Sequence, residues 1–297
     1  MDDKNRLERM RLITQRVNNI PTLPEVMTKI IQMVDDPRTT ANLLAEYIGR
    51  DQALTAKILK LANSAFYGFP QKIGTINLAI VVLGFESVKD LGLSAAVVET
   101  FREGEYNGVF DLHHFWVHAV AVAAGCKIVS RHMKVNISGE IFVAGLLHDI
   151  GKLILCRHLT EEYIVVIKTA REQKKDIYRM ELELLGFNHA DVGGWLSEQW
   201  NLPQHQTNAI YYHPYPWLSY REPNLAMLVN FANLLANKAG YDAIEDIVAP
   251  EMHPKVITYL HLKKCSETEV DWEYYLNLLS VEMEHAKGFL SLLRQIE

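Results

Sequence analysis

Cysteine is scarce in this sequence, and it does not occur in the spacings that are typical of disulfide bonds in small secreted domains. The three cysteines, Cys126, Cys156 and Cys265, include no CxxC pair, and their odd number leaves no complete disulfide framework. The N-terminus lacks an apolar signal core, and no uncharged apolar run is long enough to span a bilayer. We therefore expect a cytoplasmic protein that has no membrane as a partner.

An excess of positive charge is also missing. The chain has 30 Lys and Arg against 36 Asp and Glu, which gives a formal net charge of -6. A mildly acidic protein gains little from general attraction to phosphate backbones, so nucleic acid is not expected as a partner. The stretch 40–64 resembles a helix-turn-helix in spacing, but its second helix offers only Lys57 and Lys60 as basic residues.

The sequence has few of the patterns that predict β-strands. Alternating apolar runs are scarce, and hairpin turn pairs do not occur. Apolar residues instead recur at helical spacing, as in Val26, Ile30 and Val34. Asp51 and Asn188 stand where helix caps are expected, and Gly240 can end the helix that Pro223 opens. With 297 residues and 49% hydrophobic content, the chain can bury a substantial core. These patterns predict an all-α fold, a multi-helix bundle with an N-terminal helical subdomain.

The best candidate for a boundary is the segment 103–108, where two glycines and two acids interrupt the apolar pattern. We expect residues 1–105 to form an N-terminal subdomain of roughly five helices. Residues 106–297 would form a second helical subdomain with the C-terminal helices, and all twelve histidines lie in this second part.

The strongest local signal for chemistry is an adjacent pair, His148 and Asp149, in the otherwise apolar stretch 145–153. We expect one continuous helix here. Burying an ionised aspartate without a partner costs roughly several kcal/mol, and a metal ion is the simplest partner for both side chains. Imidazole and carboxylate ligands together suit iron, manganese, zinc or nickel, with one or two ions in the site.

Further ligands must come from other helices, which can converge on one point in a bundle core. The candidates are His118, His189, His213 and Asn233. Each also has an ordinary explanation, because a single buried histidine is usually a hydrogen-bonded core residue. His189 can be a first-turn residue, and Asn233 can belong to a solvated helix edge with Asn230 and Asn237.

The ordered set of His118, His148-Asp149 and a late polar residue on an apolar helix resembles the H…HD…D signature of the HD superfamily. The stretch from His148 to Lys152 looks like the HDIGK variant of HD-GYP proteins. The N-terminal half is similar to HDOD domains in four segments. These are Ile20-Pro21-Thr22-Leu23-Pro24, Ile48 to Thr55, Leu61 to Gly68 and Ile76 to Gly84. The resemblance runs from about Ile20 to about Gly240.

This resemblance implies a bundle of HD-superfamily type, with His118, His148, Asp149, His189, His213 and Asn233 as candidate metal ligands. The late acid of the signature appears as Asn233, which brings no charge to a cation, and the GYP-type loop after His213 is missing. HDOD proteins resemble regulators that have lost catalytic residues. The resemblance therefore implies a regulatory or interaction module in signal transduction, with a partly retained metal site.

The alternative is a metal-dependent phosphohydrolase that acts on a nucleotide or another phosphate ester. In that case Lys152, one turn after Asp149, would be the catalytic residue that steadies substrate phosphate, although it can equally be a surface lysine. We expect a signalling protein as the partner, and a small phosphate-containing ligand is consistent with both functions.

Overall fold

The computed structural model describes residues 3–69, 71–102, 111–134, 139–219, 223–244, 248, 251–266 and 269–293. These residues form helices joined by turns, and the described ranges hold no β-strand beyond one isolated bridge between Lys264 and Val270. The predicted all-α fold is confirmed. The candidate boundary at 103–108 lies outside the described residues, so the division at residue 105 stays a prediction.

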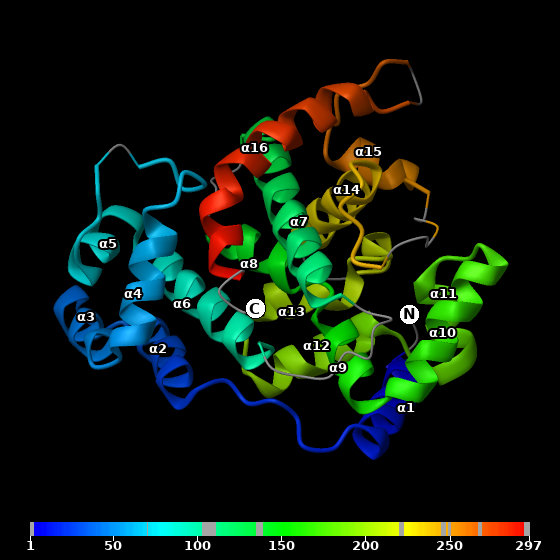
Figure 1. Ribbon diagram of the computed structural model, residues 1–297, viewed down its shortest axis with the longest axis horizontal. Coiled ribbons are helices and arrows are strands. Elements are labelled where there is room, and N and C mark those ends of the chain that lie inside the picture. Colours follow the sequence, from blue (N-terminus) through cyan, green and yellow to red (C-terminus); the bar gives the residue numbers. More distant parts are fainter. Residues whose placement is uncertain are drawn as a thin grey trace.

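Five helices of the first hundred residues pack together at the left of Figure 1. Thr40, Asp51 and Thr75 each cap a helix by accepting a hydrogen bond from a backbone N–H three residues later. The five are α2 (Glu25–Asp35), α3 (Ala41–Gly49), α4 (Gln52–Ala62), α5 (Ile76–Leu83) and α6 (Phe85–Thr100).

The first helix, α1 (Asp3–Arg16), does not join that group. It lies at the opposite end of the molecule, against α12 (His189–Gln199), and the extended segment between α1 and α2 crosses beneath the bundle (Figure 1). Arg9 on α1 forms an ion pair with Asp191 on α12 at 3.2 Å. Residues from the first part of the chain therefore brace the histidine-rich part.

The long helix α7 (Leu112–His132) forms the centre of the second part, and the side chain of Asp111 caps its start. By length and composition α7 could cross a membrane, but 78% of its apolar window is buried inside the protein. Two glycines allow neighbouring helices to approach it closely. A Cβ at Gly125 would lie 2.9 Å from Ala232, and a Cβ at Gly145 would lie 2.6 Å from the Cα of Ala123. The neighbours are α8 (Gly139–Leu147), α14 (Asn224–Lys238) and α16 (Trp272–Leu293).

The other elements lie below α7 and to its right in Figure 1. One expectation fails here: residues 145–153 are not one helix, because α8 ends at Leu147 and the next helix begins at Ile150. His148 and Asp149 therefore occupy the junction between two helices, where a change of chain direction lets both side chains face one point. The elements are α9 (Ile150–His158), α10 (Thr160–Gln173), α11 (Ile177–Leu185), α13 (Gln204–Tyr212), η1 (Pro216–Leu218) and α15 (Pro254–Tyr259).

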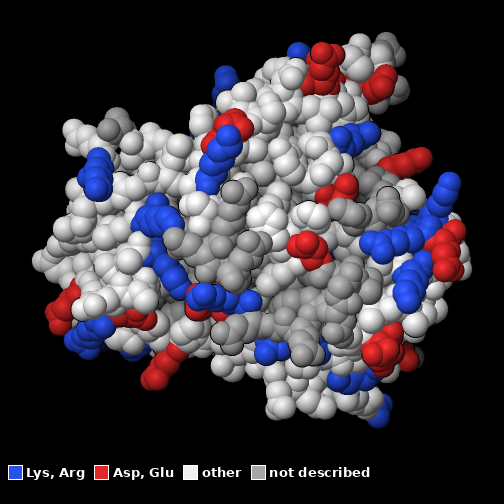
Figure 2. Space-filling view, viewed as in Figure 1, with Lys and Arg blue, Asp and Glu red and all other residues white. Residues whose placement is uncertain are grey.

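The described charges of both signs are interspersed on the face shown in Figure 2. The described part of this face therefore shows no broad basic area of the kind that binds a nucleic-acid backbone.

Candidate metal centre

The predicted histidines and Asp149 come together in the core. His118 projects from α7, His148 and Asp149 from the α8–α9 junction, His189 from the first position of α12 and His213 from the end of α13. All five side chains are almost completely buried. Asn188 caps α12 as predicted, and it forms a capping box with Asp191, in which the two residues exchange hydrogen bonds between side chain and backbone. His189 is thereby held at a defined helix end.

Each of the four imidazoles uses its Nδ1 atom to contact a hydrogen-bond acceptor. Nδ1 of His118 contacts the carbonyl oxygen of Tyr241 at 2.5 Å, and Nδ1 of His148 contacts that of Gly145 at 2.8 Å. His213 uses the carbonyl of Ile210 at 2.9 Å, and His189 uses the carboxylate of Glu181 at 2.6 Å. Acceptors of this kind require a proton on Nδ1, so in the neutral form of each imidazole Nε2 is left with a lone pair for a metal ion.

All four Nε2 atoms face the Asp149 carboxylate. Oδ2 lies 3.3 Å from His148 Nε2 and 3.6 Å from His118 Nε2, whereas Oδ1 lies 3.2 Å from His189 Nε2 and 3.5 Å from His213 Nε2. The site thus has two halves, and each half combines one carboxylate oxygen with two imidazoles.

These residues fit a transition metal. Two ligands that bind one tetrahedral ion at about 2.1 Å lie about 3.4 Å apart, which is close to the observed separations. Oδ1 of Asp149 is buried and has no hydrogen-bond partner among the described residues, and a bound cation would satisfy this oxygen. His118, His189 and His213 line a cavity of about 70 Å³, which has room for one or two ions with a few water molecules.

The electrostatics also favour a bound cation. Burial by itself raises the pKa of Asp149, but His148, Lys152 and His189 outweigh it and hold that pKa well below its usual range. Burial lowers the pKa of His213 to about 3 and also lowers that of His148. At neutral pH the centre therefore contains an ionised carboxylate and at least two neutral imidazoles, the protonation states that metal ligands need.

His189 is the exception among the imidazoles. Burial lowers its pKa, but the carboxylates of Glu181 and Asp149 outweigh burial and raise it to about 9. A metal ion that binds at this half of the site must displace a proton from His189, which couples metal binding to pH.

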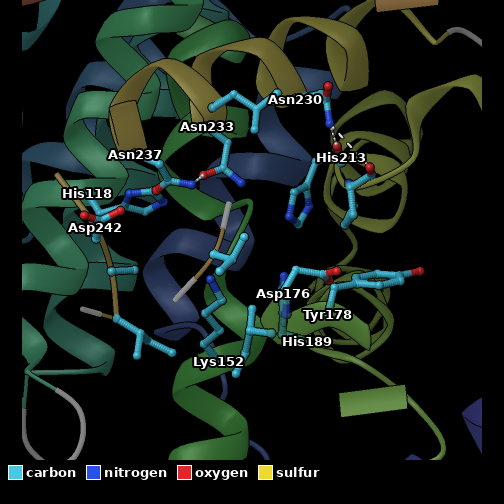
Figure 3. A pocket seen from close by; sticks show the side chains of 16 residues that line it. His118, Lys152, Asp176, Tyr178, His189, His213, Asn230, Asn233, Asn237 and Asp242 are labelled. Carbon is cyan, nitrogen blue, oxygen red and sulfur yellow. Dashed lines mark hydrogen bonds between the residues drawn. The ribbon is translucent and has the colours of Figure 1, made fainter. Parts of the chain in front are cut away.

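Lys152 does not lie on the surface. Its side chain is 9% exposed, and its ammonium group lies 2.5 Å from Asp149 Oδ2. Figure 3 shows the side chain pointing into the cavity, with His118 on one side and His189 on the other. The ammonium group therefore neutralises the same carboxylate oxygen that faces His118 and His148.

Asn233 lines the cavity, but its Oδ1 accepts a hydrogen bond from Asn237 at 3.3 Å, so a role as a metal ligand stays a prediction. The solvated-edge explanation is wrong for Asn230, which is buried and donates to the His213 carbonyl at 2.7 Å. Asp242 lines the same cavity beside His118, as Figure 3 shows.

Two acidic residues near the centre, Asp242 and Glu181, were not predicted from the sequence. Asp242 follows the end of α14 and has no local pattern that marks it. Glu181 does have a signal, because it lies at helical spacing between Ile177 and Leu185, on an otherwise apolar stripe of α11. A charged residue in such a stripe needs a buried partner.

The chain is similar to known proteins in both sequence and fold. A family model described as the HDOD domain matches residues 20–216. The fold is similar to that of an HDOD domain protein of unknown function from Geobacter sulfurreducens, at 23% identity and a TM-score of 0.77 over 98% of this chain and 99% of that one. A putative phosphohydrolase from Shewanella amazonensis is 25% identical, with a TM-score of 0.72 over 96% of this chain and 98% of its own.

One curated relative, an uncharacterized protein of Treponema pallidum, is 24% identical over 229 residues. The match covers 75% of this chain but 43% of the relative, so the chain spans less than half of that protein's length.

Proposed function

Because the chain belongs to the HDOD domain family, we propose that it is a metal-binding regulatory module of signal transduction. The observation that carries the proposal is the set of four imidazoles around Asp149, beside a cavity of about 70 Å³. Pockets that hold drug-sized ligands measure roughly 300–1,000 Å³. The cavity therefore suits an ion better than a substrate.

His118, His148, Asp149, His189 and His213 would hold the ion. A bound transition metal supplies a cross-link here between α7, the α8–α9 junction, α12 and α13, and a ligand that binds only the folded state stabilises that state. Asn233 adds no negative charge to the centre, and Lys152 already pairs with Asp149. These features support a structural or sensing role of the metal site. A partner protein could then detect whether the site holds its ion.

One observation favours the alternative, a phosphohydrolase that acts on a nucleotide or another phosphate ester. A groove of about 760 Å³ adjoins the metal cavity and shares Asp176, Pro214, Asn230 and Val248 with it. Its walls include Arg179, which pairs with Asp176, and two lysines, so cations are at hand for a phosphate group. In this alternative Lys152 would steady the phosphate group beside the centre.

The experiment compares the full chain with His148→Ala, and uses His114→Ala as a control on the same helix as His118. The side chain of His114 is 48% exposed, so its loss should leave the centre unchanged. We expect bound metal in the wild type and the control, with little turnover of phosphate esters. His148→Ala should lose the metal and melt earlier. Robust hydrolysis by the metal-loaded wild type, abolished in His148→Ala at an unchanged melting temperature, would instead establish the enzyme.

A further inference from the structure

The four imidazoles of the centre are held in two different ways. His118, His148 and His213 donate their Nδ1 protons to backbone carbonyls, which are neutral. His189 alone donates to a carboxylate, that of Glu181. The ring of His189 therefore lies between two acids, with Glu181 at Nδ1 and Asp149 at Nε2.

The side chain of Glu181 has a fixed position in the core. Its side chain is fully buried on α11, and Oε1 accepts a hydrogen bond from the Tyr163 hydroxyl at 2.8 Å. Oε2 accepts two bonds from His189, at 2.9 Å from the backbone N–H and 2.6 Å from Nδ1. Among the described ion pairs, His189 is the only partner of Glu181. Three bonds thus fix the carboxylate, and two of them fix one histidine.

We propose that Glu181 is a positioning residue of the metal centre, an inference that rests on the proposed function. It holds the His189 ring so that Nε2 faces Asp149 Oδ1. A carboxylate that accepts the Nδ1 proton also makes the imidazole a stronger donor to a metal. Glu181 thereby supplies through His189 some of the negative charge that Asn233 does not provide.

A purely structural role for Glu181 makes a different prediction. The carboxylate could serve only to attach α11 to the start of α12, since a buried acid that accepts three hydrogen bonds stabilises any fold. In that case its replacement would lower the melting temperature but leave the affinity for metal unchanged. Metal affinity and the spectrum of a bound ion separate the two roles.

The test is a titration of the metal-free full chain with Co²⁺, followed by visible absorption. Glu181→Gln keeps the shape of the side chain, and its amide can still accept both bonds from His189 while the Tyr163 hydroxyl rotates to accept from the new NH2. The charge is the main change. We expect Co²⁺ to bind Glu181→Gln roughly 10–100-fold more weakly, with a shifted visible band.

Glu282→Gln is the matched control. Glu282 is also buried, and it pairs with Lys127 and Arg131 on α7, away from the Asp149 cluster. It should melt earlier than the wild type yet bind Co²⁺ with unchanged affinity and spectrum. If Glu181→Gln binds Co²⁺ within twofold of the wild type with the same band, the inference fails. If the wild type itself takes up no Co²⁺, the proposed function fails and the inference fails with it.

A measurement on the wild type covers the case in which Glu181→Gln does not fold. In Zn²⁺-loaded protein with ¹⁵N-labelled histidine, one Nδ1 proton of the four liganding rings should resonate clearly downfield of the other three, because only one ring donates to a carboxylate. Four equivalent Nδ1 environments would overturn the inference.

Discussion

Gly151 and His189 meet backbone to backbone, where α9 crosses α12. A Cβ at position 151 would lie 1.9 Å from the carbonyl oxygen of His189 and 2.7 Å from the backbone nitrogen of Gly193. This contact sets the distance between Asp149, two residues before Gly151, and the imidazole of His189. Gly151 therefore has a spatial role, because only a residue without a side chain allows the two helices to bring Asp149 and His189 together.

Replacing Gly151 with alanine should disrupt both the fold and the centre. The added methyl group meets backbone atoms that cannot rotate away, so α9 and α12 must separate, and we expect a loss of about 3 kcal/mol or more in the free energy of unfolding. Urea denaturation and Co²⁺ titration measure the two effects. Gly49→Ala is the control, because a Cβ there has no neighbour within 4 Å, and it should change stability by less than about 1 kcal/mol. Equal stability of the two variants would contradict the close contact.

Removing the ammonium group of Lys152 should strengthen metal binding. In Lys152→Met the Asp149 carboxylate loses the ammonium group that lies 2.5 Å from its Oδ2 atom. A metal ion then no longer competes with that ammonium group for the carboxylate. We expect at least a severalfold gain in Co²⁺ affinity, together with a lower melting temperature of the metal-free variant. Lys168→Met, on the exposed face of α10, should change neither quantity. A weaker affinity in Lys152→Met would show that Lys152 assists the metal rather than competing with it.

The ion pair between Arg9 and Asp191 should contribute measurably to stability. Asp191 is buried and belongs to the capping box whose two residues flank His189, while the Arg9 side chain is 18% exposed. Arg9→Met leaves this carboxylate without its cation, and we expect a loss of about 1–3 kcal/mol in urea denaturation. Arg38→Met removes a pair with Asp36 whose arginine is 88% exposed, so it should cost under about 1 kcal/mol. Similar losses in both variants would argue against a bracing role of α1.

Asp90 should make the stability depend on pH away from the metal centre. Burial raises its pKa to about 7, although Lys89 acts to lower it, and among the described residues neither carboxylate oxygen has a hydrogen-bond partner. A carboxyl group whose pKa is higher in the folded state than in the unfolded state loses its contribution to stability as pH rises from about 4 to 7. Asp90→Asn should therefore match the wild type near pH 4 and exceed it above pH 7, by up to about 4 kcal/mol.

Thermal unfolding of both proteins across this pH range measures the difference. Glu46→Gln, whose side chain is 68% exposed, should follow the wild type at every pH. A constant difference between Asp90→Asn and the wild type would show that Asp90 ionises normally.

The sequence by itself determined the helical fold, several helix ends and most of the residues that meet around Asp149. Caps such as Asp51, Asp111 and the Asn188 capping box depend on hydrogen bonds within three residues, so local sequence is enough to predict them. His148 and Asp149 were identifiable because an acid in an apolar stretch needs a partner. The HDOD family could be identified from the sequence because each of its characteristic segments is a short run of consecutive residues.

The tertiary structure decided what depends on packing between distant segments. His118 bonds to a carbonyl 123 residues away, and α1 lies on α12 rather than beside α2. The helix break between Leu147 and Ile150 was not predictable, because neither of the two residues in between is a glycine or a proline. Glu181 and Asp242 reach the centre only through the arrangement of their helices. The physical reason is that side-chain periodicity fixes which face of a helix is buried, whereas the contacts of many helices together fix which residues meet there.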